Sequence, residues 1–141
     1  MNYPPLLRLH VILVTKYRRK VFAGKMLKFA EKTFAGILQD RRCSLIEFGG
    51  EEDHVHLLVD IHPALNISTL VNNLKSASFK RLRREFSKHI KKFYRKPVFW
   101  HTACYVGSVG NVGNVTLETI QRYVEQQGTN EKPRKKLDLP G

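Results

Sequence analysis

The order of the apolar segments constrains the fold of this chain more than any other feature. Residues 6–15 are rich in Val, Ile and Leu and begin directly after two prolines, a pattern typical of a strand. Residues 25–41 carry apolar side chains at three- and four-residue spacing, which predicts an amphipathic helix. Two more strands follow at 44–49 and 54–61, and the short acidic turn between them indicates an antiparallel hairpin.

The second half of the chain also predicts helices and a strand in turn. Apolar side chains at helical spacing predict a long helix from Asn66, and its second half, KRLRREFSKHIKK, is dense in cations. Residues 102–110 predict a fourth strand, and a last helix follows over 115–127. The first six elements have the βαββαβ order of ferredoxin-like and RNA-recognition-like domains. We therefore expect an α+β fold: a four-stranded antiparallel sheet with helices on one face, plus a C-terminal helix that carries a tyrosine.

The length and composition predict one soluble domain. A chain of 141 residues is long enough to bury a core without staples, and we expect the domain to span 1–128, with a flexible basic tail at 129–141. Cys43 and Cys104 form no CxxC pair, so neither a disulfide framework nor a four-ligand zinc site is indicated. Because no apolar run approaches ~18 residues, we expect a cytoplasmic protein without membrane contact.

The charge balance favours a polyanionic partner. The 25 Lys and Arg residues against 12 Asp and Glu give a formal net charge of +13. Such an excess repels itself, and phosphates that release their condensed counterions offset this cost. Four aromatic residues among the cations, Tyr17, Phe93, Tyr94 and Trp100, are candidates for stacking on unpaired bases, although Trp100 suits a core at least as well. The candidate DNA-binding residues are Lys16, Arg18, Arg19, Lys80, Arg81, Arg83, Arg84 and Lys88.

Two histidines alternate with apolar residues in EEDHVHLLVDI, residues 51–61. Alternate strand residues point the same way, so His54 and His56 share one face and lie roughly 7 Å apart along the strand. Two imidazoles in that arrangement can bind one metal ion, but strand histidines are also often structural or exposed to solvent. The other histidines lack a partner pattern and are interpreted as structural: His10, His62, His89 and His101.

The last helix carries a second pair of polar residues. Tyr123 and Gln127 are four residues apart, so both lie on one side of the helix, at the edge of its apolar stripe. This position is near the surface, where the helix meets the sheet. An amphipathic tyrosine at such a seam and a surface amide would explain the two residues without any function.

Together these stretches resemble a known family. HVHLL in the third strand and YVEQQ in the last helix, with KYRRKVF, LNISTLVNNLKSASFKRLRREF and FWHTACYVGSVGNVGNVTLETIQRY, resemble the single-tyrosine HUH transposases of the insertion-sequence 200/605 type. The likeness covers about residues 6–128. It implies that His54, His56 and Gln127 are metal ligands and that Tyr123 attacks a phosphodiester in single-stranded DNA. The products would be a 5′-phosphotyrosine intermediate and a free 3′-OH, followed by strand transfer.

The resemblance also implies the cofactor and the partners. Imidazoles alone suit zinc, nickel or copper, so Mg²⁺ or Mn²⁺ is expected from the family likeness only. The expected DNA is single-stranded, with hairpins at the ends of a mobile element, and the expected assembly is a homodimer with composite active sites. The glycine series Gly107, Gly110 and Gly113 fits a hinge before the tyrosine helix, and an ordinary flexible loop explains it as well.

Two alternatives remain open at the level of sequence. A catalytically silent nucleic-acid-binding domain of RNA-recognition type would need neither the histidine pair nor Gln127, and its sheet would display aromatic residues. The second strand offers only Phe48 for that role. A host-adopted transposase relative acting on repeated hairpins would share the chemistry, but the short chain, without a substantial extension, argues against it.

Overall fold

The computed structural model describes residues 6–109 and 117–127, and its centre is a four-stranded sheet. The strands lie in the order β2 (Ser44–Glu51), β3 (His54–Ile61), β1 (Leu7–Thr15) and β4 (Trp100–Ser108). Every neighbouring pair is antiparallel. The predicted α+β fold with βαββαβ order is therefore confirmed.

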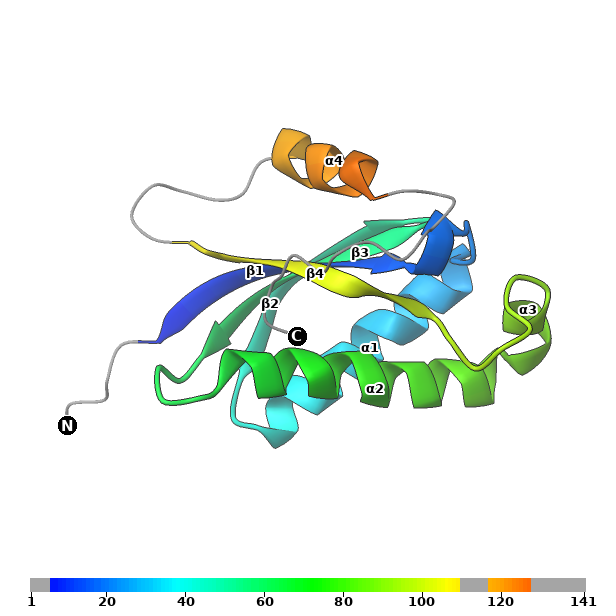
Figure 1. Cartoon of the computed structure of the whole chain (residues 1–141). Helices are drawn as coiled ribbons and strands as arrows, with labels where there is room; N and C mark the ends of the chain where they lie inside the picture. Colours follow the sequence, from blue (N-terminus) through cyan, green and yellow to red (C-terminus); the bar gives the residue numbers. More distant parts are fainter. Residues whose placement is uncertain (1–5, 110–116, 128–141) are drawn as a thin grey trace.

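The helices cover both faces of this sheet. Helices α1 (Gly24–Asp40) and α2 (Ile67–Glu85) lie side by side on one face, as predicted, and α4 (Leu117–Gln126) lies on the opposite face (Figure 1). The two interior strands of the sheet, β3 and β1, therefore have one face toward the α1–α2 layer and one toward α4. This arrangement gives the molecule two separate apolar clusters.

The larger cluster, which we call the main core, lies between the sheet and the α1–α2 layer. It takes alternate residues of the strands, such as Val11, Val55 and Leu57, because successive strand side chains point to opposite faces. Phe34 and Leu74 pack onto them from the two helices, both fully buried. Burying one such side chain contributes roughly 1.5–3 kcal/mol, so this cluster provides most of the folding energy.

The smaller cluster, which we call the α4 cluster, lies on the other face. Its buried members are Ile12 and Val14 of β1 with Ile120 and Val124 of α4. Tyr105 and Tyr123 are partly buried against them. The four-residue spacing of Ile120 and Val124 gives α4 one apolar stripe, which is its contact with the sheet.

Helix α2 begins as predicted, but it ends sooner. The Asn66 side chain accepts a hydrogen bond from the Thr69 backbone N–H at 3.0 Å and caps the first turn. The predicted single helix through the cationic segment is wrong, because the Phe86 backbone leaves the helical region and separates α2 from the short α3 (Ser87–Lys91). The Phe86 ring packs edge-to-face on Phe29 of α1, a tertiary contact that helical periodicity does not reveal.

Strand β4 lies two residues closer to the N-terminus than predicted. It begins at Trp100, which pairs with Thr15 of β1, and it ends at Ser108. Gly107, expected in the hinge, is therefore a strand residue and pairs with His10. Gly110, Gly113 and the expected tail at 129–141 lie outside the described residues.

Two expectations about the class of protein can be compared with the structure. Cys43 and Cys104 are both buried, and no disulfide joins them. Across residues 6–109 and 117–127, no helix is long and apolar enough to cross a membrane.

The buried hydrogen bond between Trp100 and Ser78 gives a test of the main core. The Trp100 indole N–H donates to Ser78 Oγ at 3.1 Å, and Ser78 is fully buried. Replacing Ser78→Ala leaves the indole without its acceptor, so we expect the free energy of unfolding to fall by about 1–3 kcal/mol in urea denaturation. The exposed Ser76→Ala on the same helix is the control and should stay within ~0.5 kcal/mol of wild type. Equal losses of unfolding free energy in Ser78→Ala and Ser76→Ala would contradict a stabilising role for this hydrogen bond.

Candidate active site

The face of β3 that is turned toward α4 carries both histidines of the predicted pair. Val55 and Leu57 enter the main core, so His54 and His56 point to the other side of the sheet. The His54 ring is almost fully buried, and His56 is half-buried. The predicted common face is thus observed, and a rigid sheet holds both imidazoles.

The His56 imidazole lies over a glycine of the neighbouring strand. Gly49 of β2 pairs with His56, and a Cβ atom at Gly49 would be 2.5 Å from His56 Nε2 and 2.7 Å from Cε1. No side chain fits there without moving the ring. Glycine at this position therefore leaves the space over β2 that the His56 imidazole occupies.

Asp53 fixes the orientation of the His54 ring. Its Oδ1 is 2.9 Å from His54 Nδ1, and its Oδ2 accepts a hydrogen bond from Arg18 Nε at 3.2 Å. A carboxylate acceptor keeps the proton on Nδ1, so Nε2 has its lone pair free for a ligand. Metal-binding histidines commonly have such a carboxylate on the second nitrogen, and sequence reasoning did not single out Asp53.

The local electrostatics keep these groups in the states that a metal site needs. Burial alone would raise the pKa of Asp53, but hydrogen bonds and charges from His54 and Arg18 lower it overall. Burial, and next the charge of His54, lower the pKa of His56. A neutral imidazole and an ionised carboxylate at pH 7 are the forms that bind metal and orient a ligand.

Glu51 is a further candidate ligand that sequence reasoning did not identify. Its Oε2 is 3.9 Å from His54 Nε2, the ring nitrogen that Asp53 does not contact. The signal available in the sequence was its position three residues before His54, directly across the hairpin in the strand ladder. Within the described part of the chain, no three His, Cys, Asp or Glu side chains are gathered as a metal cluster. A third ligand therefore requires a movement of Glu51 or a residue of another type, such as an amide.

A cavity of about 320 Å³ opens beside His54, between the hairpin turn and α4. It contains both acidic and basic groups, and α4 contributes one side of it. This mixture suits a cation together with an anionic substrate. The residues that line this cavity are Arg18, Lys20, Glu51, Glu52, Asp53, His54, Gln121, Val124 and Glu125.

Tyr123 packs toward the opposite edge of the sheet. Its ring centroid is 5.7 Å from that of Tyr105 on β4. Tyr105 pairs with Ile12, and Ile12 pairs in turn with His56, so Tyr105 and His56 are two strands apart, roughly 10 Å. With α4 in this position, the helix presents Gln121 to the His54 cavity.

Gln127 lies one turn beyond Tyr123, and its side chain is engaged with its own helix. The Gln127 Nε2 donates to the Tyr123 carbonyl oxygen at 3.3 Å. The structure therefore brings His54 and His56 together on one strand and Tyr123 and Gln127 together on one helix. Among the hydrogen bonds of the described residues, none joins Gln127 to either histidine.

The predicted DNA-binding cations form two groups. Lys16, Arg18 and Arg19 lie in or beside η1 (Lys16–Arg18), where Arg18 is held by Asp53. In the second group Arg83 lies over the Phe79 ring at 5.7 Å, whereas four others are exposed on α2 and α3. The four exposed residues are Lys80, Arg81, Arg84 and Lys88.

The aromatic candidates divide between core and surface. Trp100 and Tyr94 belong to the main core, and Tyr17 and Phe93 are half-buried at its edge. Only the latter two therefore remain candidates for contact with bases.

His10 of β1 is a polar residue buried in the sheet. It is 6% exposed, and neither ring nitrogen has a hydrogen-bond partner among residues 6–109 and 117–127. Its ring centroid is 5.5 Å from that of His56 on the neighbouring strand. Burial, and next the charge of His56, lower the pKa of His10 to about 4, so the ring is neutral at pH 7. The interpretation of His10 as an ordinary structural histidine does not account for an imidazole without partners.

Comparison with protein families gives a match over nearly the whole chain. The family model "Transposase IS200 like" matches residues 5–127. Among curated proteins, the transposase for insertion sequence element IS200 of Salmonella typhimurium is 28% identical over 131 residues, covering 93% of this chain and 83% of the relative. The ISDra2 transposase TnpA of Deinococcus radiodurans is 27% identical over 125 residues, covering 89% and 86%.

Solved structures give the same result for the fold. A crystal structure of a Deinococcus radiodurans protein assigned as a transposase superposes with a TM-score of 0.76 at 27% identity, covering 91% of this chain and 95% of that one. A REP-associated tyrosine transposase, bound to a REP hairpin, has a TM-score of 0.56 at 10% identity, covering 89% and 66%. The latter similarity concerns the fold alone.

Removal of the His10 imidazole, which is buried without a hydrogen bond among the described residues, should stabilise the protein. We expect His10→Leu to raise the free energy of unfolding by about 1–3 kcal/mol at pH 7, because it removes a buried imidazole without partners. The folded pKa of about 4 lies below the ordinary 6.5, so the unfolded chain binds the proton more tightly. Wild type should therefore lose stability as the pH falls from 6.5 toward 4, and the variant's advantage should grow at pH 5.

His89 supplies the matched control for this measurement. Its Nε2 donates to the Val21 carbonyl at 2.7 Å, so His89→Leu should lower stability by about 1 kcal/mol in the same urea titration. A loss of stability in His10→Leu similar to that in His89→Leu would contradict the description of His10 as unpartnered.

The contact between His56 and Gly49 predicts a local rearrangement. Gly49→Ala should displace the His56 ring, because its Cβ would lie far inside van der Waals distance of that ring. Histidine side-chain NMR resonances measure this: His56 should shift strongly and His54 little. Gly24→Ala is the control, since nothing lies within 4 Å of its added Cβ. Unchanged His56 resonances in Gly49→Ala would show that the ring does not lie on the glycine.

Proposed function

Because the chain belongs to the IS200-like transposase family, we propose that it cleaves and rejoins single-stranded DNA through Tyr123, with a divalent metal at His54 and His56. The observation that carries this proposal is the imidazole pair on β3, with one ring oriented by Asp53 and the other laid over Gly49. An ordinary structural role requires neither arrangement. The protein would act in the cytoplasm, on hairpin-bearing ends of a mobile element.

The metal would be Mg²⁺ or Mn²⁺. His54 Nε2 and the His56 ring would each provide a nitrogen, and Gln127 an amide oxygen after α4 moves. Glu51 is close enough to His54 to add the carboxylate oxygen that such hard cations prefer. When bound, the ion supplies Lewis-acid polarisation of a phosphate oxygen.

The chain's own residues would perform the exchange of bonds. Tyr123 Oη loses its proton and forms a bond to phosphorus, while the bond from phosphorus to the 3′ oxygen breaks and that oxygen takes up a proton. The products are a 5′-phosphotyrosine and a free 3′-OH. The covalent link conserves the bond energy, so a second strand's 3′-OH can reverse the step without ATP.

Movement of α4 is part of this proposal. In the described position Tyr123 packs on Tyr105, two strands from His56. Among the described residues the α4 cluster has four buried members and is separate from the main core, which favours reversible docking. We propose a homodimer in which α4 of one chain completes the histidine site of the other. The hinge before α4 would include Gly110 and Gly113. Both lie within the proposed domain 1–128, which precedes a flexible basic tail at 129–141.

The DNA would be bound mainly through its phosphates. The exposed cations of α2 and α3 and the group around η1 supply the charge, and a folded single strand is the expected ligand. A REP hairpin bound by a structurally similar transposase supports a hairpin as ligand. The alternative of a silent RNA-recognition-type module is less favoured, since α4 and the histidine pair occupy the face that would display aromatics.

The covalent step gives the direct test of this function. Incubated with Mn²⁺ and single-stranded oligonucleotides carrying the ends of its own element, wild type should give a protein–DNA band on a denaturing gel. Tyr123→Phe should give none, because it lacks the attacking oxygen. Tyr105→Phe, on the adjacent strand, is the control and should retain the band.

A band that persists in Tyr123→Phe, or one that Tyr105→Phe also abolishes, would contradict the role of Tyr123. A tight, salt-sensitive complex that never becomes covalent and survives EDTA would favour the binding module instead.

A further inference from the structure

A second hollow lies beside η1, the turn that also contributes Arg18 to the His54 cavity. It measures about 590 Å³, within the range of small-molecule sites. It is formed by η1 and by the segment that runs from the end of α3 toward β4. The lining residues are Lys16, Tyr17, Arg19, Lys91, Lys92, Phe93, Tyr94, Arg95, Lys96 and Val98.

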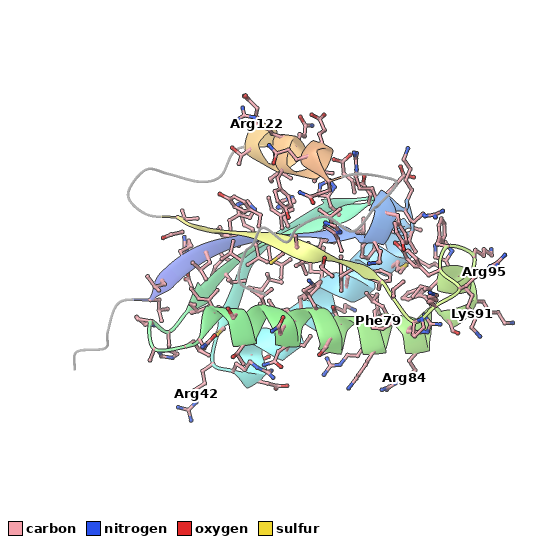
Figure 2. All side chains as sticks on the ribbon, viewed as in Figure 1. Arg42, Phe79, Arg84, Lys91, Arg95 and Arg122 are labelled. Atoms are coloured by element: carbon pink, nitrogen blue, oxygen red, sulfur yellow. The ribbon has the colours of Figure 1, made fainter. Side chains whose placement is uncertain are left out.

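The charge of this hollow is of one sign. Six of its ten lining residues are Lys or Arg, and none of the ten is Asp or Glu. By contrast, the His54 cavity contains four acidic residues among nine. Figure 2 shows Lys91 and Arg95 at the α3 end of the molecule. The hollow therefore attracts an anion, and its two partly exposed aromatic residues, Tyr17 and Phe93, suit an anion with a planar, apolar part.

Tyr17 is the aromatic residue most directly surrounded by charge. Lys16 Nζ is 5.3 Å and Arg19 Cζ 5.4 Å from the Tyr17 ring centroid. The turn that carries the ring is anchored, because the Tyr94 hydroxyl donates to the Lys16 carbonyl at 2.6 Å. Both cations lie over the ring, so a base that stacks on Tyr17 would displace one of these long side chains, which could then contact its phosphates.

The backbone of η1 turns neighbouring side chains in different directions. Tyr17 and Arg18 have φ of 60° and 53°, in the left-handed region that bulky residues rarely adopt. Arg18 contacts Asp53 in the His54 cavity, whereas Tyr17 lines the basic hollow. Consecutive residues of one turn thus serve both cavities, and such strain is concentrated at functional sites.

We propose that the basic hollow binds one unpaired nucleotide of the DNA strand, next to the phosphodiester at His54 and His56. Its base stacks on Tyr17, and its phosphates contact Lys16, Arg19 and the cations after α3. This rests on the proposed function, because it takes the strand to be the DNA that Tyr123 cleaves. It adds a specific position for an unpaired base, which a general basic surface does not provide.

Binding without cleavage tests the proposal. The probe is fluorescein-labelled oligothymidylate of about 20 nucleotides, and the protein carries Tyr123→Phe in every sample. In fluorescence anisotropy, Tyr17→Leu should weaken binding about fivefold or more, because it removes the stacking ring. Tyr17→Phe keeps the ring and should bind as the parent does. A duplex of matched length has no unpaired base, so Tyr17→Leu should leave its affinity unchanged.

A paired charge variant tests the phosphate contacts. Arg95→Gln should weaken oligothymidylate binding and reduce the slope of log affinity against log salt by about 0.7. Arg42→Gln removes the same charge at the far end of the molecule and should have little effect (Figure 2). Thermal melting of each variant establishes that it is folded. If Tyr17→Leu does not fold, quenching of a 2-aminopurine base in the strand by the Tyr17→Phe protein replaces it as the readout for stacking.

Three results would overturn the proposal: equal binding of Tyr17→Leu and Tyr17→Phe, equal loss on duplex and single strand, or absence of quenching. Weakening by Arg95→Gln alone would mean that the hollow holds phosphate without a base, and would also overturn it. The covalent assay on Tyr123 is independent of these results. A missing adduct together with Tyr17-dependent binding would refute the proposed function and not the nucleotide site.

Discussion

The pairing of β3 with its two neighbours is the constraint on which the site depends. Because β3 is central, its histidines are fixed from both sides: Ile12 of β1 and Gly49 of β2 flank His56, and Asp53 orients His54 from the hairpin turn. A shift of one residue in this register would turn both imidazoles into the main core and bring Val55 and Leu57 out. The apolar pattern of the strand prevents that shift. The core and the site are thus specified by the same alternation.

The two apolar clusters divide the molecule by function. The main core holds the sheet, α1 and α2 as a rigid support, and the α4 cluster attaches the tyrosine helix by a smaller contact. A support that positions ligands should be rigid, and a nucleophile that serves successive strands should be able to change position. The buried His10, adjacent to His56, lies on the face between these two parts. Its imidazole is buried without a hydrogen bond among the described residues, so we expect it to lower the stability of this face.

Most of the fold follows from periodicity in the sequence, and the exceptions have identifiable causes. The alternation in β3 and the spacing in α1 predict the elements to within one or two residues. The break at Phe86 and the early start of β4 at Trp100 depend on tertiary contacts with α1 and β1, which a local pattern does not contain. The histidine pair lies within one strand, so a local pattern could predict it. The contacts of Asp53 with His54 and of Gly49 with His56 could not be predicted in this way. Their roles appear only when β2 and β3 are placed side by side.

Titration calorimetry with Mn²⁺ would show whether His54 and His56 hold a metal. Each chain should bind one ion, and His56→Ala should weaken binding about tenfold or more, because even groups that only orient a metal ligand contribute that much. Circular dichroism should remain unchanged, since the His56 ring is not part of the main core. Equal Mn²⁺ affinity in wild type and His56→Ala would contradict a metal site at His54 and His56.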